Sequence, residues 1–179
     1  MDIFAHGLWA GAGYKALNRK YGTKLNVKIA AFWGIFPDIF AFSIPLTWMT
    51  VQLLLGNIQT SDFSHHPAVG EPPAQDTLWI FALANSLYSI SHSAVVFFAV
   101  FFGVWFILKR PVWELGGWLL HILIDVPTHT YQFFPTPVFW PLSGITFSGI
   151  AWSEPWFMFL NYGMLLVMYL FLMRKKKTA

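Results

Sequence analysis

Long apolar runs, separated by short polar or basic segments, dominate this chain of 179 residues. Four runs predict helices that cross a bilayer, whose hydrocarbon core is ~30 Å thick. They cover Ile29–Leu55, Thr77–Leu108, Pro111–Val126 and Pro155–Met173. Residues 1–14 are too short to cross and predict a half-helix that starts inside the membrane. We therefore expect an all-α fold: a polytopic membrane helical bundle of about four transmembrane helices plus an N-terminal half-helix, forming a single integral membrane domain over residues 1–179.

The second and third runs carry additional signals. As one helix, Thr77–Leu108 would measure about 48 Å, so we expect it to protrude from the bilayer or to break near Asn85–Ser89. The third run opens with Pro111 in a first-turn position and stops before Pro127. Residues 130–155 follow it, and they are too rich in Pro to span and too aromatic to be left in water. We expect this segment to form a loop or lid on the outer membrane surface.

The composition agrees with a membrane protein. Charged residues make up 11% of the chain, against about 25% in soluble domains. Asp2 stands where a secretory signal has its basic segment, and no small-residue cleavage site follows, so no cleavable signal peptide is expected. The sequence contains no Cys, which excludes disulfides, thiolate metal ligands and a Cys nucleophile. Any metal site must therefore be built from His and carboxylates.

All eleven Lys and Arg residues fall on one side of a four-span arrangement. They form three groups, namely Lys15–Lys28, Lys109–Arg110 and Arg174–Lys177. The positive-inside rule makes that side cytoplasmic, together with the C-terminus. The opposite side carries acidic residues only: Asp62, Glu71, Asp76 and Glu154. We interpret the basic residues as topology anchors and expect no nucleic-acid partner.

Six ionisable side chains interrupt the apolar runs: Asp2, His6, Asp38, His92, His121 and Asp125. A carboxylate or imidazole at that depth costs several kcal/mol unless it is compensated, so each is a functional candidate. Counted from the nearest basic segment at about 1.5 Å per residue, His6, Asp38 and His121 lie about 14–17 Å above the cytoplasmic edge, and the other three lie about 20–26 Å above it. We therefore expect an active site in the outer half of the bilayer.

Two pairs are spaced four residues apart, Asp2 with His6 and His121 with Asp125. Each pair shares one helix face and can offer two ligands to one metal ion. The alternative for the second pair is an interhelical hydrogen bond that holds the bundle together. For Asp2 alone, the alternative is compensation of a helix dipole. His129 follows Asp125 by four residues and would extend the face of the second pair by one helical turn. It is either a third ligand or a loop residue beyond the helix end.

Asp38 and His92 have their own local settings. Asp38 follows Pro37, and its alternative role is to satisfy backbone groups freed where that Pro breaks a helix. His92 stands between Ser91 and Ser93, whose hydroxyls could orient its ring, and its alternative role is that of a hydrogen-bonded core histidine. Both residues are among the six ionisable side chains that are expected to meet in the middle or outer half of the bilayer, so we expect them to be metal ligands.

Five short motifs stand in order along the chain: Met1-Asp2 with His6 and Gly7, Pro37-Asp38, Ser91-His92-Ser93, His121-x-x-x-Asp125 and Trp140-Pro141-Leu142-Ser143. As a set they resemble the bacterial membrane-bound metal-dependent hydrolase family, which includes LexA-regulated inner-membrane hydrolases. The resemblance implies a location in the bacterial inner membrane. Two positions depart from the family pattern: Phe40 replaces the second acid of Pro-Asp-x-Asp, and Tyr88-Ser89 replace a His-Arg pair.

That family is similar to the zinc-dependent phospholipase C and single-strand nuclease superfamily. In those proteins a helical bundle uses an N-terminal segment and His-x-x-x-Asp pairs to bind zinc ions that cleave phosphate esters. The resemblance therefore implies a metal site and phosphoester chemistry for this chain. The two departures replace one carboxylate and one imidazole, which implies fewer metals, another substrate or lost activity.

Taken together, these features predict a membrane-embedded metal-dependent hydrolase that cleaves a phosphoester of a phospholipid or lipid-linked substrate by metal-activated water. We expect one to three divalent ions, zinc first and manganese as the alternative. The predicted ligands are His121, Asp125, Asp38 and His92, with Asp2 and His6 at a second position. Asp2 or Asp125 would act as general base. The alternatives are a metal or proton transporter, which the lack of an internal repeat disfavours, and a non-catalytic membrane assembly protein.

Overall fold

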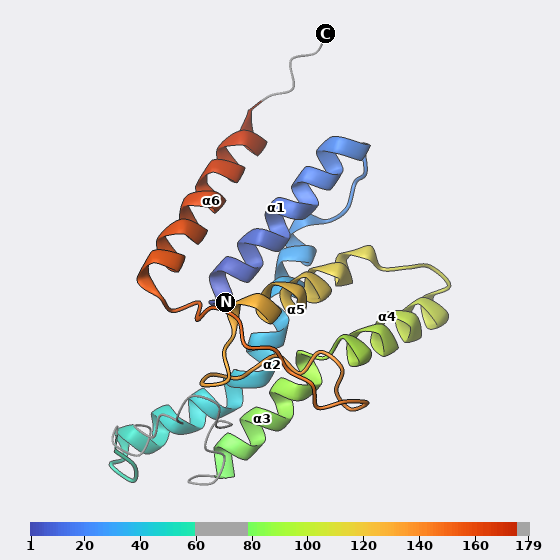
Figure 1. Cartoon of the computed structure of the whole chain (residues 1–179). Helices are drawn as coiled ribbons and strands as arrows, with labels where there is room; N and C mark the ends of the chain where they lie inside the picture. Colours follow the sequence, from blue (N-terminus) through green and yellow to red (C-terminus); the bar gives the residue numbers. More distant parts are fainter. Residues whose placement is uncertain (60–78, 175–179) are drawn as a thin grey trace.

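The computed structural model describes residues 1–59 and 79–174, and this part of the chain is helical (Figure 1). Its α-helices are α1 (Ile3–Tyr21), α2 (Val27–Leu54), α3 (Trp79–Ser91), α4 (Ala94–Leu108), α5 (Gly116–Thr128) and α6 (Pro155–Met173). Within the described residues, the one extended pairing is an isolated bridge between Thr130 and Phe133. The all-α prediction is confirmed. Some residues that entered the span and orientation predictions lie outside the described residues: Thr77, Lys175–Lys177, Asp62, Glu71 and Asp76.

Two of the described helices, α2 and α6, are long and apolar enough to cross a membrane. Helices α3 and α4 add a third candidate if the bent pair counts as one span. Helix α5 has 13 residues, fewer than the ~20 that a straight span needs. It begins only at Gly116 because a loop and a 3₁₀ turn over Trp113–Leu115 precede it. The helices are consistent with membrane association, whereas the arrangement of about four spans is not confirmed.

Helix α1 is longer than the predicted half-helix over residues 1–14, since it runs for 19 residues. The carboxylate of Asp2 caps its start by accepting a hydrogen bond from the backbone N–H of Ala5 at 3.0 Å. Gly22 ends it in the left-handed conformation, with φ 68°, which Gly adopts without steric cost. Arg19 and Lys20 lie in the last turn, where they complement the helix dipole.

The second apolar run breaks at His92-Ser93, not near Asn85–Ser89 as the polar side chains predicted. Helices α3 and α4 meet there at an angle of 56°. The Ser93 side chain caps α4, and the backbone N–H of Ala94 donates to the carbonyl of Val138 at 2.9 Å. A distant loop therefore supplies the hydrogen bond that a continuous helix would have supplied locally.

Helix α2 contacts α1, α3 and α5 and lies in the middle of the bundle (Figure 1). Its close approach to two of them depends on glycines. A Cβ at Gly34 of α2 would lie 2.7 Å from the Cβ of Ala10 in α1, and one at Gly117 of α5 would overlap the carbonyl of Ala30. Small residues let helix backbones approach this closely. The contact region therefore draws together the helices that carry most of the ionisable residues.

Residues 129–154 connect α5 to α6 without a helix. The segment folds back onto the bend between α3 and α4, where the hydroxyl of Ser93 donates to the carbonyl of Trp140. Its exposed apolar side chains include Phe139, Leu142, Ile145, Phe147 and Ile150. Exposed apolar surface of this kind marks a site of contact with lipid or protein. The position of residues 130–155 on the outer membrane surface stays a prediction.

Candidate metal centre

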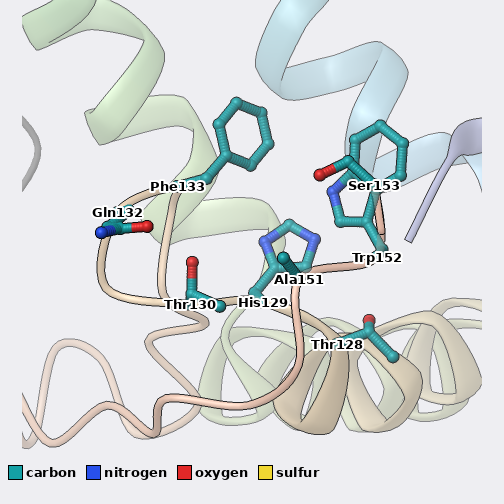
Figure 2. A pocket seen from close by; sticks show the side chains of 8 residues that line it. All are labelled: Thr128, His129, Thr130, Gln132, Phe133, Ala151, Trp152 and Ser153. Carbon is teal, nitrogen blue, oxygen red and sulfur yellow. The ribbon is translucent and has the colours of Figure 1, made fainter. Parts of the chain in front are cut away.

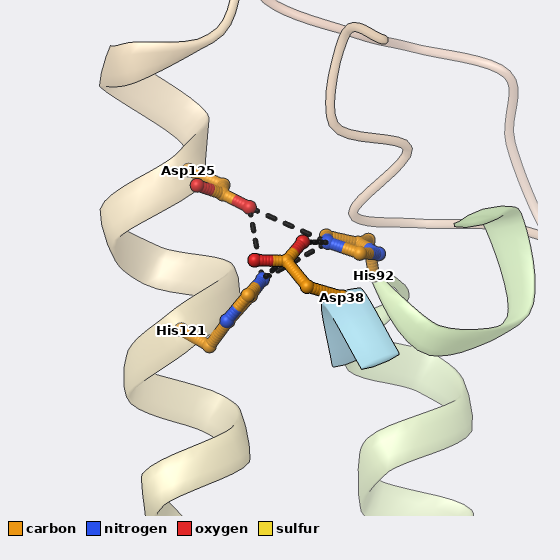
Figure 3. A group of neighbouring side chains, drawn as sticks. All are labelled: Asp38, His92, His121 and Asp125. Carbon is orange, nitrogen blue, oxygen red and sulfur yellow. Dashed lines mark hydrogen bonds and ion pairs between the residues drawn. The ribbon is translucent and has the colours of Figure 1, made fainter. Parts of the chain in front are cut away.

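Four ionisable side chains from three parts of the fold meet inside the bundle (Figure 3). Asp38 comes from α2, His92 from the bend between α3 and α4, and both His121 and Asp125 from α5. One potential ligand atom of each lies within 4.8 Å of those of the other three. The side chain of Asp38 is 12% exposed and the other three are fully buried. These are four of the six residues that the sequence placed deep in the membrane.

Hydrogen bonds fix the orientation of both imidazoles. Nδ1 of His121 lies 2.7 Å from the carbonyl oxygen of Gly34. Nδ1 of His92 lies 3.2 Å from the carbonyl oxygen of Tyr88 and 2.9 Å from Oγ of Ser91. A carbonyl oxygen can only accept, so each Nδ1 carries the proton and donates it. The Nε2 atom of each ring then presents an unprotonated lone pair to the cluster.

The spacing of these atoms fits a bound cation. The two Nε2 atoms are 2.9 Å apart, and two lone pairs at that distance repel unless a cation lies between them. Oδ2 of Asp125 lies 3.4 Å from Nε2 of His92 and 3.0 Å from Nε2 of His121, and Oδ1 of Asp38 lies 3.5 and 3.7 Å from the same nitrogens. Ligands about 2.0–2.1 Å from a tetrahedral ion are about 3.3 Å from one another. Two carboxylates would also balance the charge of a divalent ion.

The other oxygen of Asp125 faces a second set of nitrogen atoms. Oδ1 lies 2.9 Å from Nε2 of His6, 3.3 Å from Nε2 of His129 and 2.5 Å from the amino group of Met1. Both ring nitrogens of His6 are buried without a hydrogen bond. Nδ1 of His129 lies 2.8 Å from a backbone carbonyl oxygen, so its Nε2 also carries a lone pair. His129, which the sequence left open as ligand or loop residue, therefore lies at the cluster.

Asp2 lies outside the four-residue group. Its Oδ1 accepts hydrogen bonds from the backbone N–H of Ala5 at 3.0 Å and from the hydroxyl of Tyr162 at 2.7 Å. Its Oδ2 is buried and has no hydrogen bond. His6, its predicted partner on the same helix face, instead stacks on His121 with 3.6 Å between the ring centroids. The structure therefore separates the roles of Asp2 and His6.

The two serines that flank His92 also have different roles. Ser91 contacts the ring of His92 at Nδ1, as predicted for a residue that orients a ligand. Ser93 caps α4 and donates to backbone carbonyls of the loop after α5. Ser93 therefore holds the bend at His92 in place without touching the imidazole.

Sequence reasoning missed Gly34 and Tyr88. The carbonyl of Gly34 orients His121, and no side-chain pattern can reveal such a role. Tyr88 stacks on His92 with 3.7 Å between ring centroids, and its hydroxyl lies 3.2 Å from Nδ1 of His129. The spacing of four residues between Tyr88 on α3 and His92 just after its end is the signal that could have found it.

An apolar cavity of about 440 Å³ opens beside the cluster. Asp2, Asp38 and His129 lie in its wall. Most of the remaining lining is apolar and includes Ile39, Phe42 and Leu46 of α2 together with Phe133 and Trp152 of the loop. Ile39 and Leu46 are also exposed on the outside of the bundle. The cavity therefore leads from the apolar outer face of α2 to the ionisable cluster.

No protein-family model, curated protein or solved structure matches the chain. The resemblance to the membrane-bound hydrolase family therefore stays a prediction, and the function has to be argued from the site.

Proposed function

We propose that this chain is a membrane-embedded metal-dependent hydrolase that cleaves a phosphoester of a phospholipid or lipid-linked substrate. The observation that carries the proposal is the pair of Nε2 lone pairs of His92 and His121, which face each other at 2.9 Å. Two carboxylates surround them at distances that suit a tetrahedral cation. The cluster adjoins a cavity through Asp38, so a ligand can reach it.

The donor set determines which ions fit. Asp38, His92, His121 and Asp125 would hold one ion. His6 and His129 with the other oxygen of Asp125 offer donors for a second, which would displace the amino group of Met1 from that oxygen. Imidazole and carboxylate without thiolate suit zinc, with manganese as the alternative. When bound, such an ion supplies an acidified water and a Lewis acid for phosphoryl oxygens. No Lys or Arg lines the apolar cavity. The amino group of Met1, which also belongs to its lining, is already paired with Asp125, so a phosphate there would depend on bound metal for neutralisation.

Asp2 is the carboxylate best placed to act as general base. Tyr162 and the start of α1 hold one of its oxygens, while the other is buried without a hydrogen bond. Asp2 lines the same cavity as Asp38. A carboxylate with an oxygen free of hydrogen bonds can accept a proton from water once that oxygen turns toward the cavity. Both oxygens of Asp125 face imidazoles, so Asp125 binds and orients instead.

The apolar lining of the cavity favours a lipid substrate. Apolar side chains of α2 and of the loop make up most of its lining, and burial of an apolar chain there would be favourable. The outer face of α2 is apolar and long enough to cross a membrane. A lipid chain could therefore pass laterally from the bilayer into the cavity, beneath residues 130–155, and carry its phosphate to the cluster.

We also infer that the basic helix ends face the cytoplasm and that the site lies in the outer half of a bacterial inner membrane. Arg19 at the end of α1 donates to the carbonyl of Phe171 near the end of α6 at 2.8 Å. The backbone N–H of Asn26, just before α2, donates to Glu114, just before α5, at 2.9 Å. These contacts support a single basic face, which the positive-inside rule assigns to the cytoplasm. The resemblance supports the choice of membrane.

Metal content and hydrolysis test this proposal together. Protein purified without chelator should carry at least one equivalent of zinc or manganese by elemental mass spectrometry, and should hydrolyse phospholipid in mixed micelles only when loaded. His121→Ala and Asp125→Asn should each lose metal and activity. The control Glu154→Gln removes an exposed carboxylate before α6 and should retain both.

Two results would refute the proposal: no stoichiometric metal in folded wild-type protein, or equal hydrolysis after complete chelation. Metal-loaded protein that hydrolyses no lipid but supports ion flux in proteoliposomes would favour the transporter alternative.

A further inference from the structure

A second and more polar cavity, of about 280 Å³, lies beside His129 (Figure 2). Its polar lining consists of Thr128, Thr130, Gln132 and Ser153 together with the imidazole of His129. Figure 2 shows the His129 ring between residues 130–133 on one side and residues 151–153 on the other. This cavity is therefore formed where two separate parts of the loop between α5 and α6 face each other.

Backbone hydrogen bonds hold the second part of the loop against the end of α5, where the first part begins. The N–H of Gly149 donates to the carbonyl of His129 at 2.7 Å, that of Ile150 to Pro127 at 2.9 Å, and that of Trp152 to Thr128 at 3.1 Å. A side chain at Gly149 would overlap the backbone of Pro127, so only Gly permits this approach. The polar cavity is therefore a built feature of the fold and not a gap between independent loops.

The polar cavity shares a wall with the apolar cavity. His129, Phe133 and Trp152 line both. At this wall, Nε2 of His129 lies 3.3 Å from Oδ1 of Asp125. A ligand with a polar head in one cavity and an apolar chain in the other would therefore place the junction between head and chain next to the ionisable cluster.

The lining of the polar cavity indicates which head it accepts. Its polar side chains carry hydroxyls, one carboxamide and one imidazole, the remaining lining is Phe133, Ala151 and Trp152, and Lys, Arg, Asp and Glu are absent among its lining residues. A charged group placed there would lose hydration without gaining a counter-charge. A polyol would exchange its hydrogen bonds to water for hydrogen bonds to Thr, Gln and Ser, which both donate and accept. The volume is that of roughly nine water molecules in the liquid, which is enough for a glycerol or a single sugar ring.

We propose that the two cavities together bind a phospholipid whose headgroup is a neutral polyol such as glycerol. The polyol occupies the polar cavity, one acyl chain occupies the apolar cavity along α2, and the phosphate between them lies at the cluster. The cleavage of this lipid rests on the proposed function, whereas its selective binding does not.

Competition binding tests the selectivity. Metal-loaded protein in detergent is mixed with equal amounts of dioleoyl phosphatidylglycerol, phosphatidylserine and phosphatidylcholine, and the lipids retained are counted by native mass spectrometry. The three probes share their chains, so only the headgroup differs. Wild-type protein should retain phosphatidylglycerol about tenfold over the other two, as expected for one or two hydrogen bonds to the headgroup.

Variants assign the selectivity to the two cavities. Thr130→Val keeps the shape of the side chain and removes a hydroxyl from the polar cavity, so it should abolish the preference. Ser153→Ala, at an exposed residue, repeats the test if Thr130→Val does not fold. Thr47→Val, at an exposed position of α2 outside both cavities, is the matched control and should retain the preference. Leu46→Trp narrows the apolar cavity and should weaken the binding of all three lipids equally.

Three outcomes would overturn the inference: equal retention of the three lipids, a preference for phosphatidylcholine through contact with the aromatic wall, or a preference for phosphatidylglycerol that survives both polar variants. The result is separable from the proposed function. Selective binding without hydrolysis under any metal would refute only the hydrolase, and metal-dependent hydrolysis without headgroup preference would refute only the polyol site.

Discussion

The substitution Gly34→Ala should push α1 away from α2 and disturb the cluster through the backbone. The added methyl would lie 2.7 Å from the Cβ of Ala10 and 2.9 Å from the carbonyl oxygen of His6. Ordinary van der Waals contact begins at 3.4 Å, so α1 must move by about 0.7 Å, and packed interiors resist such shifts. Overpacking of this kind costs about 1–3 kcal/mol, which corresponds to a loss of about 2–12 °C in Tm for a chain of this size.

The same shift reaches the metal centre by two routes. The carbonyl of Gly34 accepts the hydrogen bond from Nδ1 of His121 at 2.7 Å, so movement of that carbonyl releases the ring. His6 moves with α1, and its Nε2 lies 2.9 Å from Oδ1 of Asp125. Loss of a partner that orients a ligating His lowers metal affinity by about 10–100-fold. We therefore expect weaker zinc binding together with the lower Tm.

Two measurements on purified protein in detergent check both expectations: thermal unfolding of the metal-free form and a zinc titration against a competing chelator. The matched control is Gly103→Ala in α4, where nothing lies within 4 Å of the added methyl. This control should keep its zinc affinity and gain up to about 1 kcal/mol from helix propensity. If Gly34→Ala matched Gly103→Ala in both Tm and zinc affinity, the argument from close helix contact would be refuted.

Two further predictions concern hydrogen bonds of the bundle. Ser91→Ala removes the hydroxyl 2.9 Å from Nδ1 of His92 and should weaken zinc binding about tenfold or more. Ser86→Ala, at an exposed residue of the same helix, should leave zinc binding unchanged. Equal zinc affinities for the two variants would contradict the role assigned to Ser91. Asn161→Leu removes the oxygen that accepts the hydrogen bond from the indole N–H of Trp9 at 2.8 Å and should lower the free energy of unfolding by about 1 kcal/mol. Adding Trp9→Phe should recover most of the lost Tm. Strictly additive losses in that double-mutant cycle would show that the bond contributes nothing.

The regular rise of a helix explains why the convergence of ionisable residues could be anticipated. Each helical residue advances about 1.5 Å, so counting from the basic segments gave Asp38 and His121 nearly the same depth. In the structure, Oδ1 of Asp38 lies 3.7 Å from Nε2 of His121. The same regularity made α2 predictable, since Val27–Leu54 differs from the predicted Ile29–Leu55 only at its ends. The count to Asp38 runs along one helix, whereas the count to His121 crosses the loop and the 3₁₀ turn before α5, so only the first count rests on helical rise.

Features that depend on distant partners could not be predicted in this way. The bend at His92 is stabilised by backbone groups of the loop after α5, including a carbonyl 47 positions away from Ser93. The partners of Asp2 and His6 could not be predicted either, although the two residues stand four apart at the start of α1. Asp2 accepts a hydrogen bond from Tyr162 of α6, whereas His6 lies against Asp125 of α5. The rotation of each helix about its axis is set by packing and not by local propensity.

Asp125 is the one carboxylate that every histidine of the centre approaches, from α1, from the bend after α3, from α5 itself and from the start of the loop. A lineage that replaced this aspartate would retain four imidazoles buried against one another, with Asp38 left to face only two of them. Selection would then act against each of them, so the histidines should disappear together and not one at a time. Among descendants of this chain, the centre should be inherited whole or replaced whole by apolar residues.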